Sequence, residues 1–70
     1  MEVVKNGIYR HFKGNEYEVI EIGLDCETLE ELVIYKALYG DGKIWVRSKA
    51  DFCSLVTRDN KTFKRFELIK

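Results

Sequence analysis

The sequence predicts an all-β domain: a small SH3-like barrel, or a strongly bent antiparallel sheet of five to six short strands in meander order. Two apolar runs flank Asp41-Gly42, and this pairing is the strongest short-range signal of a β-hairpin. Turn residues recur about every 8 to 12 positions, as they do in small sandwiches and barrels. No segment keeps a helical period over several turns, so we do not expect helices to carry the fold.

The central hairpin is expected over residues 32–49. A two-residue turn at Asp41-Gly42 and a four-residue loop over 40–43 give the same cross-strand pairing, in which side chains alternate between two faces. The uncharged face, predicted as core, holds Val33, Tyr35, Ala37, Tyr39, Ile44 and Val46. The mixed face pairs Leu38 with Trp45, Lys36 with Arg47, and Ile34 with Lys49. A three-residue loop would exchange the faces.

The remaining strands are expected over residues 7–12, 16–24, 52–57 and 62–69, with a turn at 48–51 that leaves Phe52 to plug the core. Residues 25–31 are expected to form an acidic loop or a single helical turn. Within 16–24 the apolar positions change from odd (Tyr17, Val19) to even (Ile20, Ile22). Such a phase change predicts a bulge or sharp bend. Because small barrels need bends to close, we interpret it as a sign of barrel closure.

Composition bounds the class of protein. Residues 1–70 make one small domain that is 46% hydrophobic, with twelve basic and twelve acidic residues and a formal charge of zero. This neutrality argues against a general nucleic-acid binder. No apolar run is long enough to span a membrane and the start lacks a signal-peptide core, so we expect a cytoplasmic protein without a membrane partner. In that compartment Cys26 and Cys53 are expected to stay thiols.

Three stretches resemble motifs of a known family. They are YRHFKGN at 9–15, LYGD at 38–41 and WVR at 45–47, followed by DF at 51–52 and KRF at 64–66. They are similar to motifs of the bacterial "domain of unknown function 1653" family, over residues 7–69. The resemblance implies a small bacterial β domain and no activity. Here Asp25-Cys26 stand where a His-Ser pair is usual, Ser48 replaces a proline, and Asp51 stands where Met is common, which puts in doubt any chemistry resting on the His-Ser pair.

Metal, cofactor and nucleophile chemistry have little support. His11, Cys26 and Cys53 lie far apart in sequence, and zinc spacings such as CxxC or HExxH are absent. Gly40-Asp41-Gly42 is hairpin-turn chemistry rather than a phosphate loop. We therefore predict no metal and no cofactor. His11, opposite Glu18 or Glu16 depending on the turn, is expected to make an ordinary cross-strand polar pair rather than act as a general base.

The most informative pattern combines aromatic and basic side chains. The predicted partner-binding residues are Tyr9, Arg10, His11, Tyr39, Trp45 and Arg47. Two interpretations remain open. Either Trp45 and Leu38 pack beneath a neighbouring strand, or Trp45 and one or more tyrosines line a shallow groove in which Arg47 and Arg10 hold an anionic or carbonyl-bearing partner.

The favoured function is a small binding module for a peptide or protein, not an enzyme. The first alternative is single-stranded nucleic acid, whose bases stack on aromatic rings. The second is a small anionic-ligand pocket, with or without catalysis, built around His11, Arg47 and Glu27. The third is a homodimer formed through an exposed strand, with no ligand site.

Overall fold

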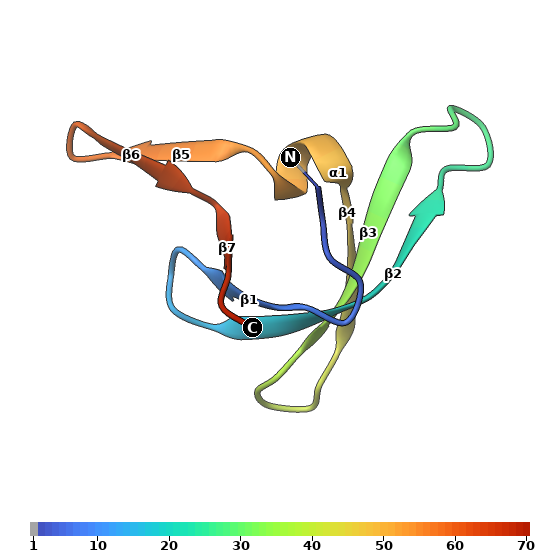
Figure 1. Cartoon of the computed structure of the whole chain (residues 1–70), viewed down its shortest axis with the longest axis horizontal. Coiled ribbons are helices and arrows are strands. Elements are labelled where there is room, and N and C mark those ends of the chain that lie inside the picture. Colours follow the sequence, from blue (N-terminus) through green and yellow to red (C-terminus); the bar gives the residue numbers. More distant parts are fainter. Residues whose placement is uncertain (1) are drawn as a thin grey trace.

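The structure, a computed structural model, describes residues 2–70 and is all-β, as predicted (Figure 1). Five strands form one antiparallel sheet in the order β4-β3-β2-β1-β7, and β5 pairs with β6 in a separate hairpin. The elements are β1 (Ile8–His11), β2 (Glu16–Leu24), β3 (Glu31–Ala37), β4 (Ile44–Ser48), α1 (Lys49–Phe52), β5 (Leu55–Arg58), β6 (Lys61–Lys64) and β7 (Phe66–Leu68). The sheet is strongly bent and does not close into a barrel.

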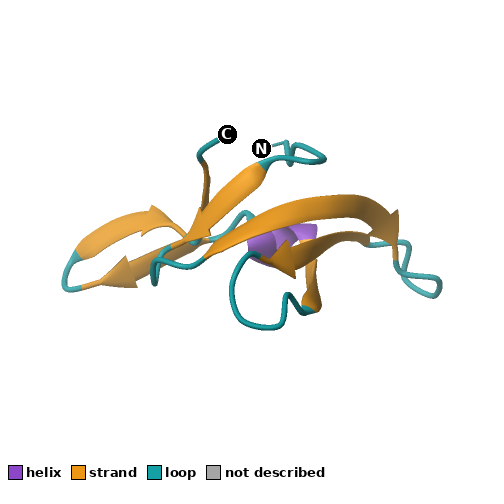
Figure 2. Cartoon of the chain, turned by 90° about the horizontal axis from the view of Figure 1, so that it is seen from below, coloured by secondary structure: helices purple, strands orange, loops and turns teal. Residues whose placement is uncertain are grey.

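The predicted bend lies in β2. Its pairing with β3 shifts register between Val19 and Glu21, which marks a β-bulge. Before the bulge, Tyr17 and Val19 face the core; after it, Ile22 packs against the same core. The bulge is therefore confirmed, but it bends the sheet without closing a barrel. α1 packs against β3 and β4, and Figure 2 shows this helix beside the curved strands of the sheet.

The central hairpin has a different register from the one predicted. Tyr35 lies opposite Trp45 and Val33 opposite Arg47, and the Ala37 N–H bonds the Lys43 carbonyl at 2.9 Å. The loop thus spans 38–42, where Gly40 and Gly42 both adopt positive φ. Because this loop has an odd number of residues, the side chains of β4 lie on the opposite faces of the sheet from those predicted. A three-residue loop would have had the same effect.

The exchange of faces affects β4 and leaves β3 as predicted. Val33, Tyr35 and Ala37 are buried, so their placement in the core is confirmed. Ile44 and Val46, predicted to be core, are 61% and 57% exposed. Trp45 and Arg47 take the inward side in their place, next to the buried residues of β3.

The first hairpin also turns differently. The N–H of His11 bonds the carbonyl of Asn15 at 2.8 Å, so the turn spans 12–14 and includes Gly14 at φ 110°. Glu16 therefore lies opposite Arg10 rather than His11, and its carboxylate contacts the Arg10 guanidinium at 3.1 Å. The predicted pairing of His11 with a carboxylate is wrong because the turn is longer than two residues.

Aromatic side chains fill the core. Phe52 stacks on Phe66 with ring centroids 4.1 Å apart, and the rings of Tyr9 and Tyr35 meet Phe52 edge-on. The role of Phe52 as a plug is confirmed, since it is fully buried. The segment predicted as a turn is the short helix α1, whose N-cap Ser48 accepts a hydrogen bond from the Asp51 N–H at 3.1 Å.

The C-terminal strand predicted over 62–69 is two strands, which raises the count to seven in the described chain. Arg65 interrupts it: its N–H bonds the Ser54 carbonyl at 3.0 Å, and its carbonyl accepts from the Phe12 N–H at 2.9 Å. The chain then returns as β7 to pair with β1. In this sheet the meander order thus holds for β1 to β4 only, and β7 forms the second edge of the sheet, beside β1.

Both cysteines are thiols, as predicted: Cys26 is exposed and Cys53 packs partly buried against the core. Among residues 2–70, no helix has the length and hydrophobicity needed to cross a membrane.

Candidate functional site

A shallow hollow of about 190 Å³ lies on the inward side of β2, β3 and β4. Its walls are Tyr17, Tyr35, Tyr39, Trp45 and Arg47, and we name it the Trp45 hollow. It forms because the observed register turns Trp45 and Arg47 of β4 toward Tyr35 of β3. Three of the six predicted partner-binding residues, Tyr39, Trp45 and Arg47, meet here.

Trp45 and Tyr39 supply accessible aromatic surface in this hollow. They are 48% and 45% exposed, and a smaller hollow of about 150 Å³ on Trp45 extends toward Asp41 and Lys43. Leu38 is 46% exposed. The interpretation in which Trp45 and Leu38 pack beneath a neighbouring strand is therefore wrong.

The tyrosines of the Trp45 hollow are held by one another. The hydroxyl oxygens of Tyr17 and Tyr39 lie 2.8 Å apart in a hydrogen bond, and the Tyr17 ring meets the Tyr35 ring edge-on at 5.3 Å. Burial, reinforced by the bond to Tyr39, raises the pKa of Tyr17 to about 12. Tyr17 therefore stays protonated at neutral pH and can take part in the bond as donor or acceptor.

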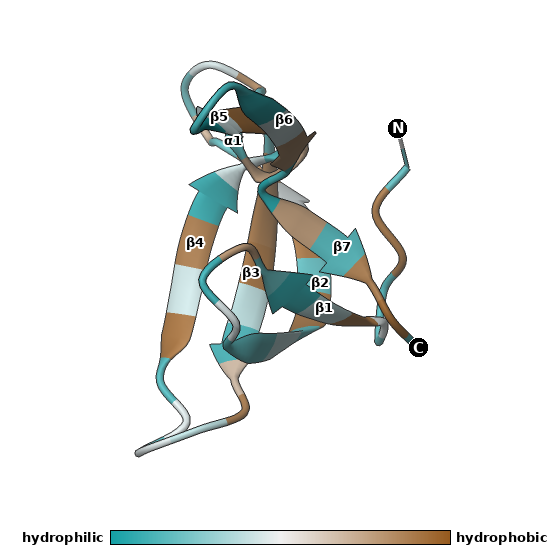
Figure 3. Ribbon diagram, turned by 90° about the vertical axis from the view of Figure 1, so that its left-hand side faces the viewer, coloured by the Kyte–Doolittle hydropathy of each residue, from teal (hydrophilic) through white to brown (hydrophobic). Residues whose placement is uncertain are grey.

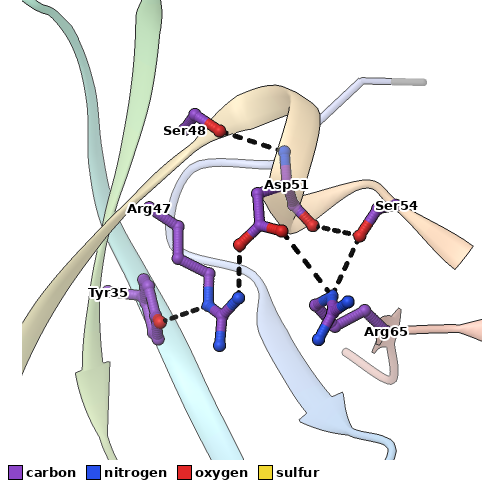
Figure 4. Close-up of polar contacts among 6 residues, drawn as sticks. All are labelled: Tyr35, Arg47, Ser48, Asp51, Ser54 and Arg65. Atoms are coloured by element: carbon purple, nitrogen blue, oxygen red, sulfur yellow. Dashed lines mark hydrogen bonds and ion pairs between the residues drawn. The ribbon is translucent and has the colours of Figure 1, made fainter. Parts of the chain in front are cut away.

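Arg47 is fixed from two sides (Figure 4). Its Nε donates to the Tyr35 hydroxyl at 2.9 Å, and its Nη1 contacts the Asp51 carboxylate of α1. The guanidinium carbon lies 5.5 Å from the centre of the Phe66 ring. Within the described chain, these bonds engage two of the five N–H donors of the guanidinium, which leaves others for a ligand.

Asp51 connects this arginine to a second one. Its other carboxylate oxygen lies 3.9 Å from Nε of Arg65, which also donates to the Ser54 hydroxyl at 2.9 Å (Figure 4). The Ser54 hydroxyl in turn donates to the Asp51 carbonyl at 2.6 Å. This network fixes Arg47 before any partner arrives, which lowers the entropy cost of binding.

The other predicted partner-binding residues lie elsewhere. Tyr9 is 1% exposed, and its hydroxyl accepts from the Val4 N–H at 2.9 Å, so it is a core residue. Arg10 and His11 border a second hollow, beside the β1–β2 turn. His11 links the two regions, since its ring lies 4.9 Å from Phe66 and 6.5 Å from Tyr17.

The environment of His11 disfavours its charged form. Burial first, and then the positive charges of Arg47, Arg65 and Lys13, lower the pKa of His11 below its ordinary value. Its Nδ1 accepts a hydrogen bond from the Lys13 N–H at 3.2 Å. His11 is thus a neutral aromatic ring at pH 7 rather than a cation.

The proposed pocket of His11, Arg47 and Glu27 is not assembled. Glu27 lies in the turn that joins β2 to β3, at the opposite end of β2 from the turn beside His11 (Figure 1). The Asp25 carboxylate accepts from the Glu27 and Thr28 N–H groups at 2.8 and 3.0 Å, so this acidic segment is a capped turn. The described residues hold no group of three metal-ligating side chains.

Sequence reasoning missed Tyr17, Tyr35 and Asp51 as site residues. Tyr35 was predicted to be a core residue, and Tyr17 was considered only for its place in the apolar alternation of residues 16–24, but both line the Trp45 hollow. Asp51 stands four residues after Arg47, and this spacing of opposite charges, together with the Ser48 cap, was a signal available in the sequence.

β4 forms the outer edge of the sheet (Figure 3). Because the Ala37–Lys43 pair is hydrogen-bonded and bonding alternates along an antiparallel ladder, Trp45 and Arg47 bond toward β3. The N–H and C=O groups of Ile44 and Val46 therefore point outward. The edge carries three consecutive exposed apolar side chains at 44–46, flanked by Lys43 and Arg47, and β4 has no proline to block pairing with another strand.

Comparisons with known proteins agree on the family. The profile of the family described as "Protein of unknown function (DUF1653)" matches residues 7–68. The crystal structure of a DUF1653 protein from Bordetella bronchiseptica superposes with a TM-score of 0.83 at 26% sequence identity, over 94% of this chain and 87% of that one. A search of curated proteins gives no match. The chain belongs to the DUF1653 family.

Proposed function

We propose that this protein is a small binding module that holds an extended segment of a partner protein against β4 and the Trp45 hollow. The observation that carries the proposal is that Trp45 and Arg47, the exposed ring and the fixed cation, both stand on an open edge strand. An open edge offers backbone hydrogen bonds, and the neighbouring hollow offers side-chain selectivity.

The backbone of β4 suits strand addition. A partner strand would bond the outward N–H and C=O groups of Ile44 and Val46 and cover their exposed side chains. On the inward side, alternate partner side chains would lie beside Trp45 and Arg47. We expect an apolar or aromatic residue next to Trp45 and a carboxylate or carbonyl group next to Arg47.

The size and charge of the hollow favour this partner class over the alternatives. About 190 Å³ is smaller than typical small-molecule pockets, which begin near roughly 300 Å³, and this argues against a buried ligand in the Trp45 hollow. Among the described residues that line the hollow, the one cation is Arg47, which is paired with Asp51. Its remaining N–H groups can meet a carbonyl or a single carboxylate, but one paired cation offsets little of the charge of a phosphate. We place the module in the cytoplasm, where its two cysteines would stay reduced.

The test is a selection from a random peptide library on the wild-type domain, followed by affinity measurements of the selected peptides on variants. Val46→Pro removes one outward N–H without touching the ladder to β3, and Trp45→Ala removes the exposed ring. Each is expected to weaken binding by about tenfold or more. Lys61→Glu, a surface change on the β5–β6 hairpin outside the sheet that contains β4, is the control and should bind normally.

Two results would contradict the proposal. One is a set of selected peptides that bind Val46→Pro and Trp45→Ala as tightly as wild type. The other is sedimentation showing a stable dimer that Val46→Pro dissociates, because β4 would then be covered by a second copy of the chain.

A further inference from the structure

A second hollow is lined by side chains of β1 and the β1–β2 turn and by side chains of β6 and β7, two regions distant in sequence. It measures about 320 Å³, and we name it the Phe12 hollow. Its lining residues are Arg10, His11, Phe12, Gly14, Phe63, Lys64 and Glu67. It shares no lining residue with the Trp45 hollow, so it is a separate candidate site.

Positive charge gathers around this hollow although the protein is neutral. Segments 10–16 and 55–68 hold half of the twelve basic residues of the chain and only a quarter of its twelve acidic residues. The basic ones are Arg10, Lys13, Arg58, Lys61, Lys64 and Arg65, and the acidic ones are Glu16, Asp59 and Glu67. This excess is a local feature that the overall composition conceals, and it favours an anionic ligand.

The cations surround an aromatic platform. The charged groups of Arg58, Lys13 and Arg65 lie 5.2, 5.8 and 6.0 Å from the centre of the Phe12 ring. The ring of His11 lies 4.4 Å from Phe12, tilted by 36°, and Phe63 lies 5.7 Å away. Three rings thus cluster, and the basic groups lie over the ring of Phe12.

We propose that the Phe12 hollow binds a short stretch of single-stranded nucleic acid. A base would stack on the platform of Phe12, Phe63 and His11, which tolerates any base because every base has a flat π face. Phosphates would contact the surrounding lysines and arginines, with Lys64 on the lining of the hollow itself. RNA and DNA share this chemistry.

The environment of His11 is consistent with an anionic ligand. Burial lowers the pKa of His11 most, and the positive charges of Arg47, Arg65 and Lys13 lower it further, so cations lie close to this ring. An acidic peptide would meet the charge but would leave the aromatic platform without a stacking partner. The pairing of rings with cations therefore favours nucleic acid over an acidic protein segment.

The experiment measures fluorescence anisotropy of labelled mixed-sequence oligonucleotides, one RNA and one DNA, with the full chain at low and moderate salt. Lys64→Glu should weaken binding by about tenfold. It should also reduce the slope of the logarithm of the binding constant against the logarithm of the salt concentration by about one, the value for one lost phosphate contact. Phe63→Ala should also weaken binding by about tenfold, because it removes a stacking surface. Lys36→Glu, the same charge change on β3 and away from the hollow, should match wild type. Two-dimensional NMR spectra of each variant confirm folding.

Three outcomes would overturn the proposal. The first is no binding of either oligonucleotide at low salt. The second is binding that Phe63→Ala leaves unchanged and that inorganic polyphosphate displaces as well as an oligonucleotide does, which would indicate charge attraction alone. The third is a polyglutamate peptide that binds in a Lys64- and Phe63-dependent way when oligonucleotides do not. None of these results depends on the Trp45 hollow, so the two proposals can fail separately.

Discussion

Arg47 donates from Nε to the hydroxyl oxygen of Tyr35 at 2.9 Å, although the two residues are diagonal rather than opposite on β3 and β4. Tyr35 is 5% exposed and its ring packs edge-on against Phe66 at 5.5 Å. The same guanidinium contacts Asp51 on α1. One hydrogen bond thus connects the aromatic core, the edge strand and the helix beside the candidate site.

Tyr35→Phe tests this connection. Removing the hydroxyl leaves the ring packing in place but takes an acceptor from a charged, partly buried donor. We expect the free energy of unfolding to fall by about 1 kcal/mol and the selected peptides to bind more weakly. Urea denaturation and peptide titration measure the two effects. An unchanged variant would show that Asp51 alone positions Arg47.

Phe52→Ala should be the most destabilising change in the core. Phe52 is fully buried, stacks on Phe66 and meets Tyr9 and Tyr35 edge-on. The expected loss is about 3–5 kcal/mol, a large fraction of the stability of so small a domain. Phe52→Leu, which keeps most of the volume, should lose less. Chemical denaturation gives both values, and equal losses would contradict the stacked arrangement.

The raised pKa of Tyr17 predicts a late titration. Since its pKa is about 12 in the folded protein and about 10 in the unfolded chain, the unfolded state ionises first as pH rises. The free energy of unfolding should therefore fall from about pH 10 and level off above about pH 12. Tyr39→Phe should lower the pKa of Tyr17, and burial should still hold it above the ordinary value.

Phenolate absorbance, followed against pH, measures this titration. Tyr17→Phe is the control, because the part of the absorbance change that it removes belongs to Tyr17. A Tyr17 titration near pH 10 rather than near pH 12 would contradict both the burial of Tyr17 and its hydrogen bond to Tyr39.

The lowered pKa of His11 predicts a loss of stability in acid. Between the lowered folded value and the ordinary unfolded value of about 6.5, the unfolded chain binds a proton that the folded chain does not. The free energy of unfolding should therefore fall as pH drops below about 6.5 and level off below the folded pKa. The difference between wild type and His11→Gln isolates this effect from the titration of carboxylates.

NMR titration of the His11 ring protons measures the pKa directly. A value at or above 6.5 in the isolated domain would contradict the burial and the cationic surroundings seen in the structure. Binding of an oligonucleotide at the Phe12 hollow should raise this pKa, because phosphates would offset the three nearby positive charges.

Local patterns predicted much of the fold. The change of apolar positions from odd to even between Val19 and Ile20 located the bulge in β2. Successive side chains of a strand point to opposite faces, so a break in the apolar alternation is visible in the sequence itself. The Asp-Gly pair located the central hairpin, and Phe52 was correctly assigned to the core. The short helix after Ser48 was missed because four residues carry too little helical signal to outweigh a turn.

The candidate site was harder to predict, because it depends on the register of two hairpins. A loop over 38–42 instead of 40–43 moved Trp45 and Arg47 to the inward side of β4 and exposed Ile44 and Val46. A similar difference at the first turn places Glu16 opposite Arg10 rather than opposite His11.

The sequence by itself determined the all-β class, the approximate positions of the hairpins, the core residues of β3 and the family, since these depend on local composition, alternation and motif. The tertiary structure decided which aromatic and basic residues share a hollow. It separated Arg10 and His11 from Tyr39, Trp45 and Arg47 and buried Tyr9. The physical reason is that loop conformation sets the face each strand residue occupies, and long-range packing brings the β5–β6 hairpin against the β1–β2 turn.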